Sequence, residues 1–262
     1  MNTPSYTGAI NIYLRAQGAE PDAFWRLFAE RRQHYQRRPW PLPTASARAA
    51  YEGKLAVDAA RREGGHDLAG SDEAGRGSLF GPVVAATVSL PAAPGEQPNP
   101  LVFVNDSKQL SRTLREKLFF FLLDHGMPLA IGLATAREID EVNIAQATLT
   151  AIERSLSRWA RPCVHLVDGR FQTALPVRHE YMIKGDARSL HIAAASIVAK
   201  VTRDFIVMTL ASLFPGYGLE RNKGYGTAGH FAALRCKGLC RLHRRSFLRK
   251  FFHRERQRPL WD

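Results

Sequence analysis

From about residue 67 onward, hydrophobic positions alternate between short strand-like runs and longer helical periods. Runs rich in β-branched or small apolar residues predict strands at HDLAGSDEAG, GPVVAATVSL, LVFV, PLAIGLATA and CVHLVDG, with VRHEYMI as a short extended segment. Helical spacing predicts helices at SRTLREKLFFFLLDHG, NIAQATLTAIERSLSRWA and SLHIAAASIVAKVTRDFIVMTLASLF. Strands that come first in hairpins and then alternate with helices indicate an α/β fold, with a mixed sheet flanked by helices.

Turn and cap residues set the limits of several of these elements. The prolines and glycine of PAAPGEQPNP predict a loop, and residues 216–226 form a glycine-rich loop. Ser111 or Thr113 is available as the N-cap of the first of these helices, Thr113 and Glu116 have the spacing of a capping box, and Gly126 is a stop signal. After the glycine-rich loop we expect a further helix at FAALRCKGLC and then a basic tail.

Residues 1–66 differ from the rest and predict a helical N-terminal extension to a main domain over residues 67–262, which includes the C-terminal helices and the basic tail. The extension has an aromatic and basic stretch ending in ERRQHYQRRPW, a proline-rich turn at 39–43, and a helix in TASARAAYEGKLAVDAARREGG that stops at Gly64-Gly65. We expect one or two helices. Their basic and aromatic residues either extend a nucleic-acid surface or pack on the main domain, and we favour packing.

The charge of the chain favours a polyanionic partner. Across 262 residues, 37 Lys and Arg oppose 24 Asp and Glu, which gives a net charge of +13 and a pI near 10.2. Such a field attracts nucleic acid, but it does not distinguish an enzyme from a coating or membrane-surface protein. No apolar run reaches the roughly 18–20 residues that span a bilayer, and the N-terminus lacks a secretory pattern. The three cysteines fit neither a disulfide framework nor a usual zinc motif, so we expect a reduced, cytoplasmic protein.

Four acidic residues are expected at the ends of predicted elements. Asp72 and Glu73 close the first strand, Asp168 ends the fifth, and Asp186 precedes the long helix. Because a sheet brings strand ends together, their oxygens could bind Mg²⁺ or Mn²⁺, and two such ions can promote phosphodiester cleavage. Taken singly, each acid outside the Asp72–Glu73 pair fits a turn former or helix cap better. Adjacent acids on a strand point to opposite faces unless the strand ends or bends, and the glycines that follow allow a bend.

Ordered sequence blocks resemble the type 2 ribonuclease H family, ribonuclease HII. The chain contains SDEAGRG with FGPVVAA, then DSKQLS, VDG, KGD, IAAASIVAKV with RD, and KGYGT with the later HRRSF. The blocks lie in the family's order from residue 69 to about 247, and together they are highly specific although each alone is weak. The resemblance implies a ribonuclease H-like fold and an endoribonuclease that uses Mn²⁺ or Mg²⁺ as cofactor.

The resemblance also implies roles for individual residues. Asp72, Glu73, Asp168 and Asp186 would be the catalytic, metal-binding acids. The enzyme would hydrolyse the RNA strand of RNA–DNA hybrids and cut at ribonucleotides embedded in duplex DNA, leaving 3′-hydroxyl and 5′-phosphate ends. The implied substrate contacts are Gly75, Arg76 and Gly77 at the ribonucleotide, Tyr225 at the sugar on its 3′ side, and Lys108, Lys184 and Lys200 at phosphates. Without the resemblance, we would expect the tyrosine to pack against the protein and the lysines to be solvated.

The sequence departs from the family's pattern beside the glycine-arginine-glycine turn. Ser78 and Phe80 stand where the family usually has Pro and Ala, and the bulk of Phe80 could alter affinity or loop position. Arg76 favours type 2 over type 3 relatives, which have Lys there and a larger N-terminal domain. A catalytically silent binding protein is disfavoured by the intact acid set. An exonuclease or resolvase of the same broad fold is disfavoured by the arginine turn and the tyrosine block.

The expected partners are RNA–DNA hybrid and ribonucleotide-containing DNA duplex, with no membrane, and we expect a monomer. Residues 257–261, QRPLW, loosely resemble short peptides that dock on sliding clamps, so a clamp is also considered as a partner of the C-terminal tail. Such matches arise often by chance, and a disordered basic tail is the favoured interpretation.

Overall fold

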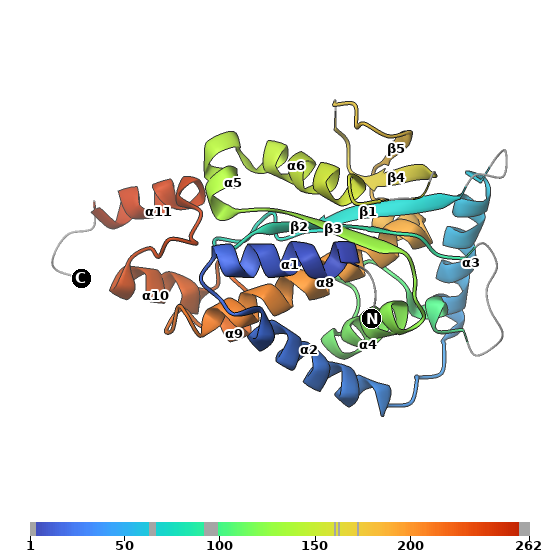
Figure 1. The fold of residues 1–262 in the computed structure, drawn as a ribbon, viewed down its shortest axis with the longest axis horizontal. Helices are drawn as coiled ribbons and strands as arrows, with labels where there is room; N and C mark the ends of the chain where they lie inside the picture. The colour runs from blue at the N-terminus through green and yellow to red at the C-terminus, as the bar shows by residue number, and fades with distance from the viewer. Residues whose placement is uncertain are drawn as a thin grey trace.

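A computed structural model describes residues 4–62, 67–91, 99–159, 161, 163–171 and 173–256. The strands are β1 (Leu68–Ala74), β2 (Val83–Val88), β3 (Leu129–Ala134), β4 (Val164–Asp168) and β5 (His179–Met182). They form one sheet in the order β3-β2-β1-β4-β5 (Figure 1). β2 runs antiparallel to β1 and β3, whereas β4 runs parallel to β1 and β5. The predicted mixed sheet is therefore confirmed.

Helices cover both faces of this sheet. They are α1 (Pro4–Ala16), α2 (Pro21–Gln36), α3 (Ala45–Ala59), α4 (Arg112–Asp124), α5 (Ala136–Val142), α6 (Ile144–Leu156), α7 (Gly185–Arg188), α8 (Leu190–Ala211), α9 (Leu219–Asn222), α10 (Ala228–Lys237) and α11 (Arg245–Arg256). α6 packs over β2 and β3 on one face, and α8 packs over β1 and β2 on the other (Figure 1). The predicted fold class, with helices at both ends of the chain, is confirmed. In the described part of the chain, no helix is long and apolar enough to cross a membrane.

One predicted strand is wrong. The first three residues of LVFV belong to a 3₁₀ helix, η2 (Pro100–Phe103), and Val104 is its C-cap. The fifth strand is instead β5, which was expected to be only an extended segment. The Asn99 side chain accepts a hydrogen bond from the Leu101 backbone N–H at 3.0 Å. Pro100 occupies the first helical position, where its fixed φ suits a helical turn. Local capping therefore outweighs the β propensity of a four-residue apolar run.

The start of α4 confirms one predicted cap and corrects another. Ser111 accepts a hydrogen bond from the Leu114 N–H at 3.2 Å, so Ser111 is the N-cap. The capping box expected between Thr113 and Glu116 is wrong, because α4 already begins at Arg112 and Thr113 lies inside its first turn.

Close packing of α8 on the sheet depends on a missing side chain in β1. Gly70 lies against the first turn of α8, where an added Cβ would sit 2.1 Å from the backbone carbonyl carbon of His191. A larger residue would therefore push the helix away from the strand that also carries Asp72. Alanine and serine positions in the first half of α8 are buried as well, which extends this close contact along the helix.

Three helices, rather than the predicted one or two, lie in the described part of residues 1–66. The α2 rings of Phe24 and Phe28 pack edge-on against Phe205 of α8, with ring centroids 6.2 and 6.3 Å apart. Both rings are buried in the main hydrophobic core, so neither can stack on a nucleic-acid base. The predicted helix stop at Gly64-Gly65 and the boundary at residue 66 lie outside the described residues, so the domain division stays a prediction.

Candidate active site

Two of the four acids lie at the adjoining ends of parallel strands. β1 and β4 pair up to Ser71 and Val167, so Asp72 and Asp168 are the next residue on each strand. Alternation along the strands directs both carboxylates to the face that α8 covers. The sheet thus brings together two acids that are far apart in the sequence.

Glu73 lies at the end of the same strand as Asp72. Strand alternation directs it to the opposite face, but β1 ends at the next residue, and Gly75 then turns the chain with a φ of 97°. The Glu73 N–H donates to Asp72 Oδ1 at 2.6 Å, and Glu73 Oε1 lies 3.3 Å from Arg76 Nη1. The charge of Asp168 contributes to the raised pKa of both Asp72 and Glu73.

Asp186 reaches the same region through the short helix α7. The backbone N–H of Gly185 donates to Asp168 Oδ1 at 2.6 Å, which joins the start of α7 to the end of β4. Asp186 does not cap the long helix α8, because Ser189 does so by accepting the Ile192 N–H at 3.3 Å. The interpretation of Asp186 as the cap of that helix is therefore wrong, and its burial beside Asp168 needs another explanation.

Burial and mutual repulsion dominate the electrostatics of these acids. Burial raises the pKa of Asp72 well above its usual range, and the charges of Glu73, Asp168 and Asp186 raise it further. Burial also raises the pKa of Glu73, against the effect of the nearby guanidinium, and the pKa of Asp186. Crowded carboxylates of this kind favour the uptake of protons or cations, because either relieves the repulsion.

The donor chemistry of these residues suits a hard divalent ion. Carboxylate oxygens are the ligands that Mg²⁺ and Mn²⁺ prefer over nitrogen or sulfur. Among the described residues, no three acidic, histidine or cysteine side chains are arranged closely enough to form a complete ion site. The fit to a metal therefore rests on donor type and on the shared charge of the cluster.

The glycine-arginine-glycine turn follows β1 directly and reaches the surface. The Arg76 side chain is 47% exposed, although its guanidinium also contacts Glu73. A Cβ added at Gly77 would meet no atom within 4 Å, so the backbone there is open to an approaching molecule. Arg76 and Gly77 are thus accessible and adjacent to the acids, whereas Gly75, the third predicted ribonucleotide contact, is buried against the Arg203 side chain.

The three predicted phosphate-binding lysines have different surroundings. The Lys108 side chain is 78% exposed, and its Nζ is 3.8 Å from Asp186 Oδ2. Lys184 is exposed at the start of α7 with a left-handed φ of 54°, two residues before Asp186. Lys200, within α8, forms an ion pair with Asp204 at 2.8 Å. Two of the three lysines are therefore near Asp186, and the third lies farther along α8.

Tyr225 is half-buried in the glycine-rich loop and has two cations near its ring. Lys200 Nζ lies 4.9 Å and Arg203 Cζ 5.2 Å from the ring centre. His230 Nδ1 donates to the Tyr225 carbonyl at 3.0 Å, and His230 Nε2 lies 3.1 Å from His243 Nε2. Contacts from α8, from α10 and from the segment before α11 therefore hold this loop in place.

Sequence patterns assigned no role to Arg203, although it is fully buried and central to the region. Its guanidinium donates to the backbone carbonyls of Phe80 and Lys223 at 3.0 Å each, and its Nε donates to that of Pro82 at 3.0 Å. Arg203 thereby joins two segments: the one that follows the glycine-arginine-glycine turn (residues 75–77, the arginine turn) and the glycine-rich loop that carries Tyr225 (residues 216–226, the Tyr225 loop). The available signal was an arginine inside an apolar helical stretch, which predicts a buried and hydrogen-bonded charge.

Arg244 is the second buried arginine and holds the turn itself. It donates to the carbonyls of Gly75 at 2.7 Å and Arg76 at 2.9 Å, and twice to that of Gly81 at 3.0 and 2.9 Å. Burial, together with the charge of Arg203, lowers the pKa of Arg244 to about 9. These carbonyls point into the protein, and the Arg76 side chain is the part of the turn that is exposed.

The two departures from the family's pattern point inward. Ser78 is fully buried and accepts a hydrogen bond from Arg203 Nη2 at 2.6 Å. Phe80 is fully buried against the rings of Phe214 and His243, with centroids 5.7 and 5.3 Å away. The bulk of Phe80 is thus directed into the core rather than onto the exposed side of the turn.

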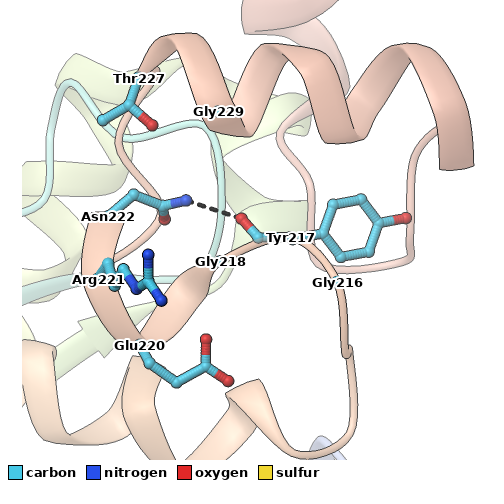
Figure 2. A pocket seen from close by; sticks show the side chains of 8 residues that line it. All are labelled: Gly216, Tyr217, Gly218, Glu220, Arg221, Asn222, Thr227 and Gly229. Atoms are coloured by element: carbon cyan, nitrogen blue, oxygen red, sulfur yellow. Dashed lines mark hydrogen bonds between the residues drawn. The ribbon is translucent and has the colours of Figure 1, made fainter.

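An open hollow of about 550 Å³ lies beside the Tyr225 loop (Figure 2). Its lining includes Glu220 and Arg221, but none of the four acids. The Asn222 amide is already engaged, because it donates to the Tyr217 carbonyl at 2.7 Å (Figure 2). This hollow is therefore distinct from the acid cluster.

Comparisons with known proteins identify the family. The family model described as ribonuclease HII matches residues 69–253. A ribonuclease HII from Syntrophotalea carbinolica is 48% identical over 190 residues, which cover 71% of this chain and 87% of that protein. Ribonuclease H2 from Pyrococcus horikoshii has a TM-score of 0.57 at 28% identity and covers 73% of this chain and 100% of that one. Bst-RNase HIII in complex with Mn²⁺ has a similar fold, with a TM-score of 0.56 at 20% identity over 76% of this chain and 73% of that one.

The matched region contains the acid cluster, the arginine turn and the Tyr225 loop, so sequence similarity and geometry concern the same part of the molecule. The match extends over more than half of the chain, and the expected resemblance is confirmed. The chain belongs to the ribonuclease HII family and is a ribonuclease H, a hydrolase of RNA in RNA–DNA hybrids.

Proposed function

We propose that this ribonuclease H uses Asp72, Glu73, Asp168 and Asp186 as metal-binding catalytic acids. The observation that carries the proposal is the placement of Asp72 and Asp168 at adjoining strand ends, with the start of α7 bound to Asp168 through Gly185. Two bound ions would activate the attacking water and stabilise the leaving oxygen, which gives 3′-hydroxyl and 5′-phosphate ends. Mg²⁺ or Mn²⁺ suits this donor set. The Mn²⁺ complex of Bst-RNase HIII supports Mn²⁺ as one of the metals that the enzyme uses.

We also propose that the enzyme cuts at ribonucleotides embedded in duplex DNA. The exposed Arg76 and the open backbone at Gly77 are adjacent to the acids, which suits recognition of a 2′-hydroxyl next to the cut. The Tyr225 ring, which Lys200 and Arg203 of α8 both approach, would contact the neighbouring sugar, and Lys108 and Lys184 would contact phosphates.

The direct test uses an end-labelled DNA duplex that contains one ribonucleotide, with the all-DNA duplex of the same sequence as control. With Mg²⁺ or Mn²⁺ we expect a single cut at the ribonucleotide and no cut in the control. Intact substrate in both metals would contradict the proposal. Hybrid binding without turnover would favour the silent binding protein, and preferential cleavage of branched DNA would favour another nuclease of this fold.

Mn²⁺ should raise the melting temperature of the protein more at about pH 8 than at about pH 5. Because the pKa values of Asp72, Glu73 and Asp186 are raised on folding, the metal-free folded state holds more protons than the unfolded chain above about pH 4. Its free energy of unfolding therefore falls as pH rises through the window between the ordinary and the raised pKa values. Bound metal takes the place of those protons. Thermal unfolding with and without Mn²⁺ measures the difference, and equal shifts at both pH values would count against it.

Two further proposals concern partners and location. A ribonuclease HII from Archaeoglobus fulgidus is known in complex with PCNA, a finding about that protein which makes a sliding clamp worth testing here. The clamp-like QRPLW segment lies outside the described residues. A pull-down with the intact chain and with the chain lacking residues 257–262 would test it. A cytoplasmic location stays a proposal.

A further inference from the structure

Helix α3 precedes the family match at residues 69–253, yet two of its charged side chains point into the protein. Lys54 and Asp58 are one helical turn apart and are 4% and 1% exposed. The structure describes every residue of α3, and Lys54 and Asp58 are its buried residues. The apolar side chains of this helix are at most partly buried. Burial of a charge is unfavourable unless specific partners offset it, so the partners of these two residues indicate what they do.

Asp58 binds the first turn of α8. Its Oδ2 accepts hydrogen bonds from the Leu190 backbone N–H at 2.9 Å and from His191 Nδ1 at 2.8 Å. On the other side of the ring, His191 Nε2 lies 3.3 Å from Arg62 Nη2. Helix α7, which carries Asp186, runs directly into this turn and also contacts α3. Asp58 therefore holds the backbone that presents Asp186.

The second oxygen of Asp58 argues against a purely stabilising role. Asp58 Oδ1 is buried and has no hydrogen-bond partner among the described residues. Burial of an acceptor without a partner is unfavourable, so this oxygen does not contribute to the anchoring of α8. Such local costs are typical of functional regions.

Lys54 binds the chain segment that leads to Lys108. Its Nζ donates to Asn105 Oδ1 at 2.9 Å, and Asn105 directly precedes the segment that contains Asp106 and Lys108. Burial lowers the pKa of Lys54, and the charges of Asp186 and Asp106 oppose this effect. Lys54 therefore joins α3 to the chain that brings Lys108 within 3.8 Å of Asp186.

We propose that α3 is a working part of the metal site, with Lys54 and Asp58 as positioning residues. They hold residues 105–108, which approach Asp186 through Lys108, and residues 185–191, which contain Asp186, so that its carboxylate is oriented for a divalent ion. This inference rests on the proposed function, because it takes Asp186 to be a metal ligand. It assigns a role in metal binding to a helix outside the family match. If α3 were only a structural anchor, changes at Lys54 and Asp58 would affect stability alone.

The test measures Mn²⁺ binding to the full chain by titration calorimetry without substrate, in Asp58→Asn and Lys54→Met. Matched controls on exposed positions of the same helix are Glu52→Gln and Arg48→Met. Loss of a residue that orients a metal ligand typically costs about 10–100-fold in metal affinity. We expect at least about tenfold weaker binding for both buried-site variants, binding like the wild type for both controls, and recovery of the cleavage rate at saturating Mn²⁺.

Circular dichroism at the titration temperature identifies the variants that are folded, and if one of the two is unfolded the other decides. Unchanged Mn²⁺ affinity in a folded variant would overturn the inference. Tighter binding by Lys54→Met would also overturn it, because the lysine would then act only through its repulsion of the ion. A wild type that binds no Mn²⁺ and cuts no ribonucleotide would instead contradict the proposed function, and the positioning role with it.

Discussion

Asp72→Asn should abolish cleavage of a duplex with a single ribonucleotide. Asp72 is buried, and the charges of Glu73, Asp168 and Asp186 all raise its pKa. Loss of a group that merely orients a ligand costs about 10–100-fold, so loss of a ligand itself should cost about a thousandfold or more. Initial rates over a series of Mn²⁺ and Mg²⁺ concentrations measure the effect, and turnover within tenfold of the wild type would contradict this role.

The same substitution should leave the metal-free protein at least as stable as the wild type. Burial and neighbouring acids disfavour the ionised Asp72 carboxylate, so its replacement by a neutral amide of similar shape removes a repulsion. A stable but inactive variant would separate a catalytic role from a structural one. Glu141→Gln, at a 53% exposed surface acid, is the matched control and should change neither activity nor stability. Unfolding of metal-free Asp72→Asn at a lower temperature than the wild type would show that this acid supports the fold.

Arg244→Met should lower the free energy of unfolding by about 3–5 kcal/mol, because buried backbone carbonyls lose a charged hydrogen-bond donor. Methionine fills much of the same volume but removes the donor to the carbonyls of Arg76 and Gly81, whereas the Gly75 carbonyl keeps the Ser78 hydroxyl at 3.0 Å. Each unpaired buried acceptor costs about 1–3 kcal/mol, and relief from burying the guanidinium offsets part of that sum. Urea unfolding at neutral pH measures the change.

The matched control for this substitution is Arg249→Met, at an exposed position of α11, where we expect a change within about 0.5 kcal/mol. A loss below about 1 kcal/mol in Arg244→Met would mean that water or a local shift satisfies the carbonyls of Arg76 and Gly81. At temperatures where the variant is folded, the arginine turn should also be displaced. Cleavage at a single ribonucleotide should therefore need more substrate to reach its maximal rate.

Local patterns predicted most elements of the fold because their causes are local. The long helix α8, the strands of the sheet and the Ser111 cap all follow from periodicity and side chains within a few residues. The same reasoning was wrong at η2, where Asn99 and Pro100 favour a helical turn over four β-prone residues. It was also wrong for the capping box, since Ser111 is the cap and lies two residues before Thr113.

The acids show the limit of such reasoning at the site. Asp186 seen locally is a helix cap, and only the position of Ser189 shows that it is not. The closeness of Asp72 and Asp168 depends on the parallel register of two strands, which no local pattern specifies. Ordered motif blocks nevertheless identified the family, because they record residues that a common fold brings together.

The sequence alone determined the α/β class, the basic charge, the four candidate acids and the family. Tertiary structure alone decided which residues hold these acids and the arginine turn in place. Arg203, Arg244, Lys54 and Asp58 are buried charges whose partners are distant in sequence. A buried charge is tolerated only where the whole fold supplies its hydrogen bonds, so its role cannot be seen before those partners are placed.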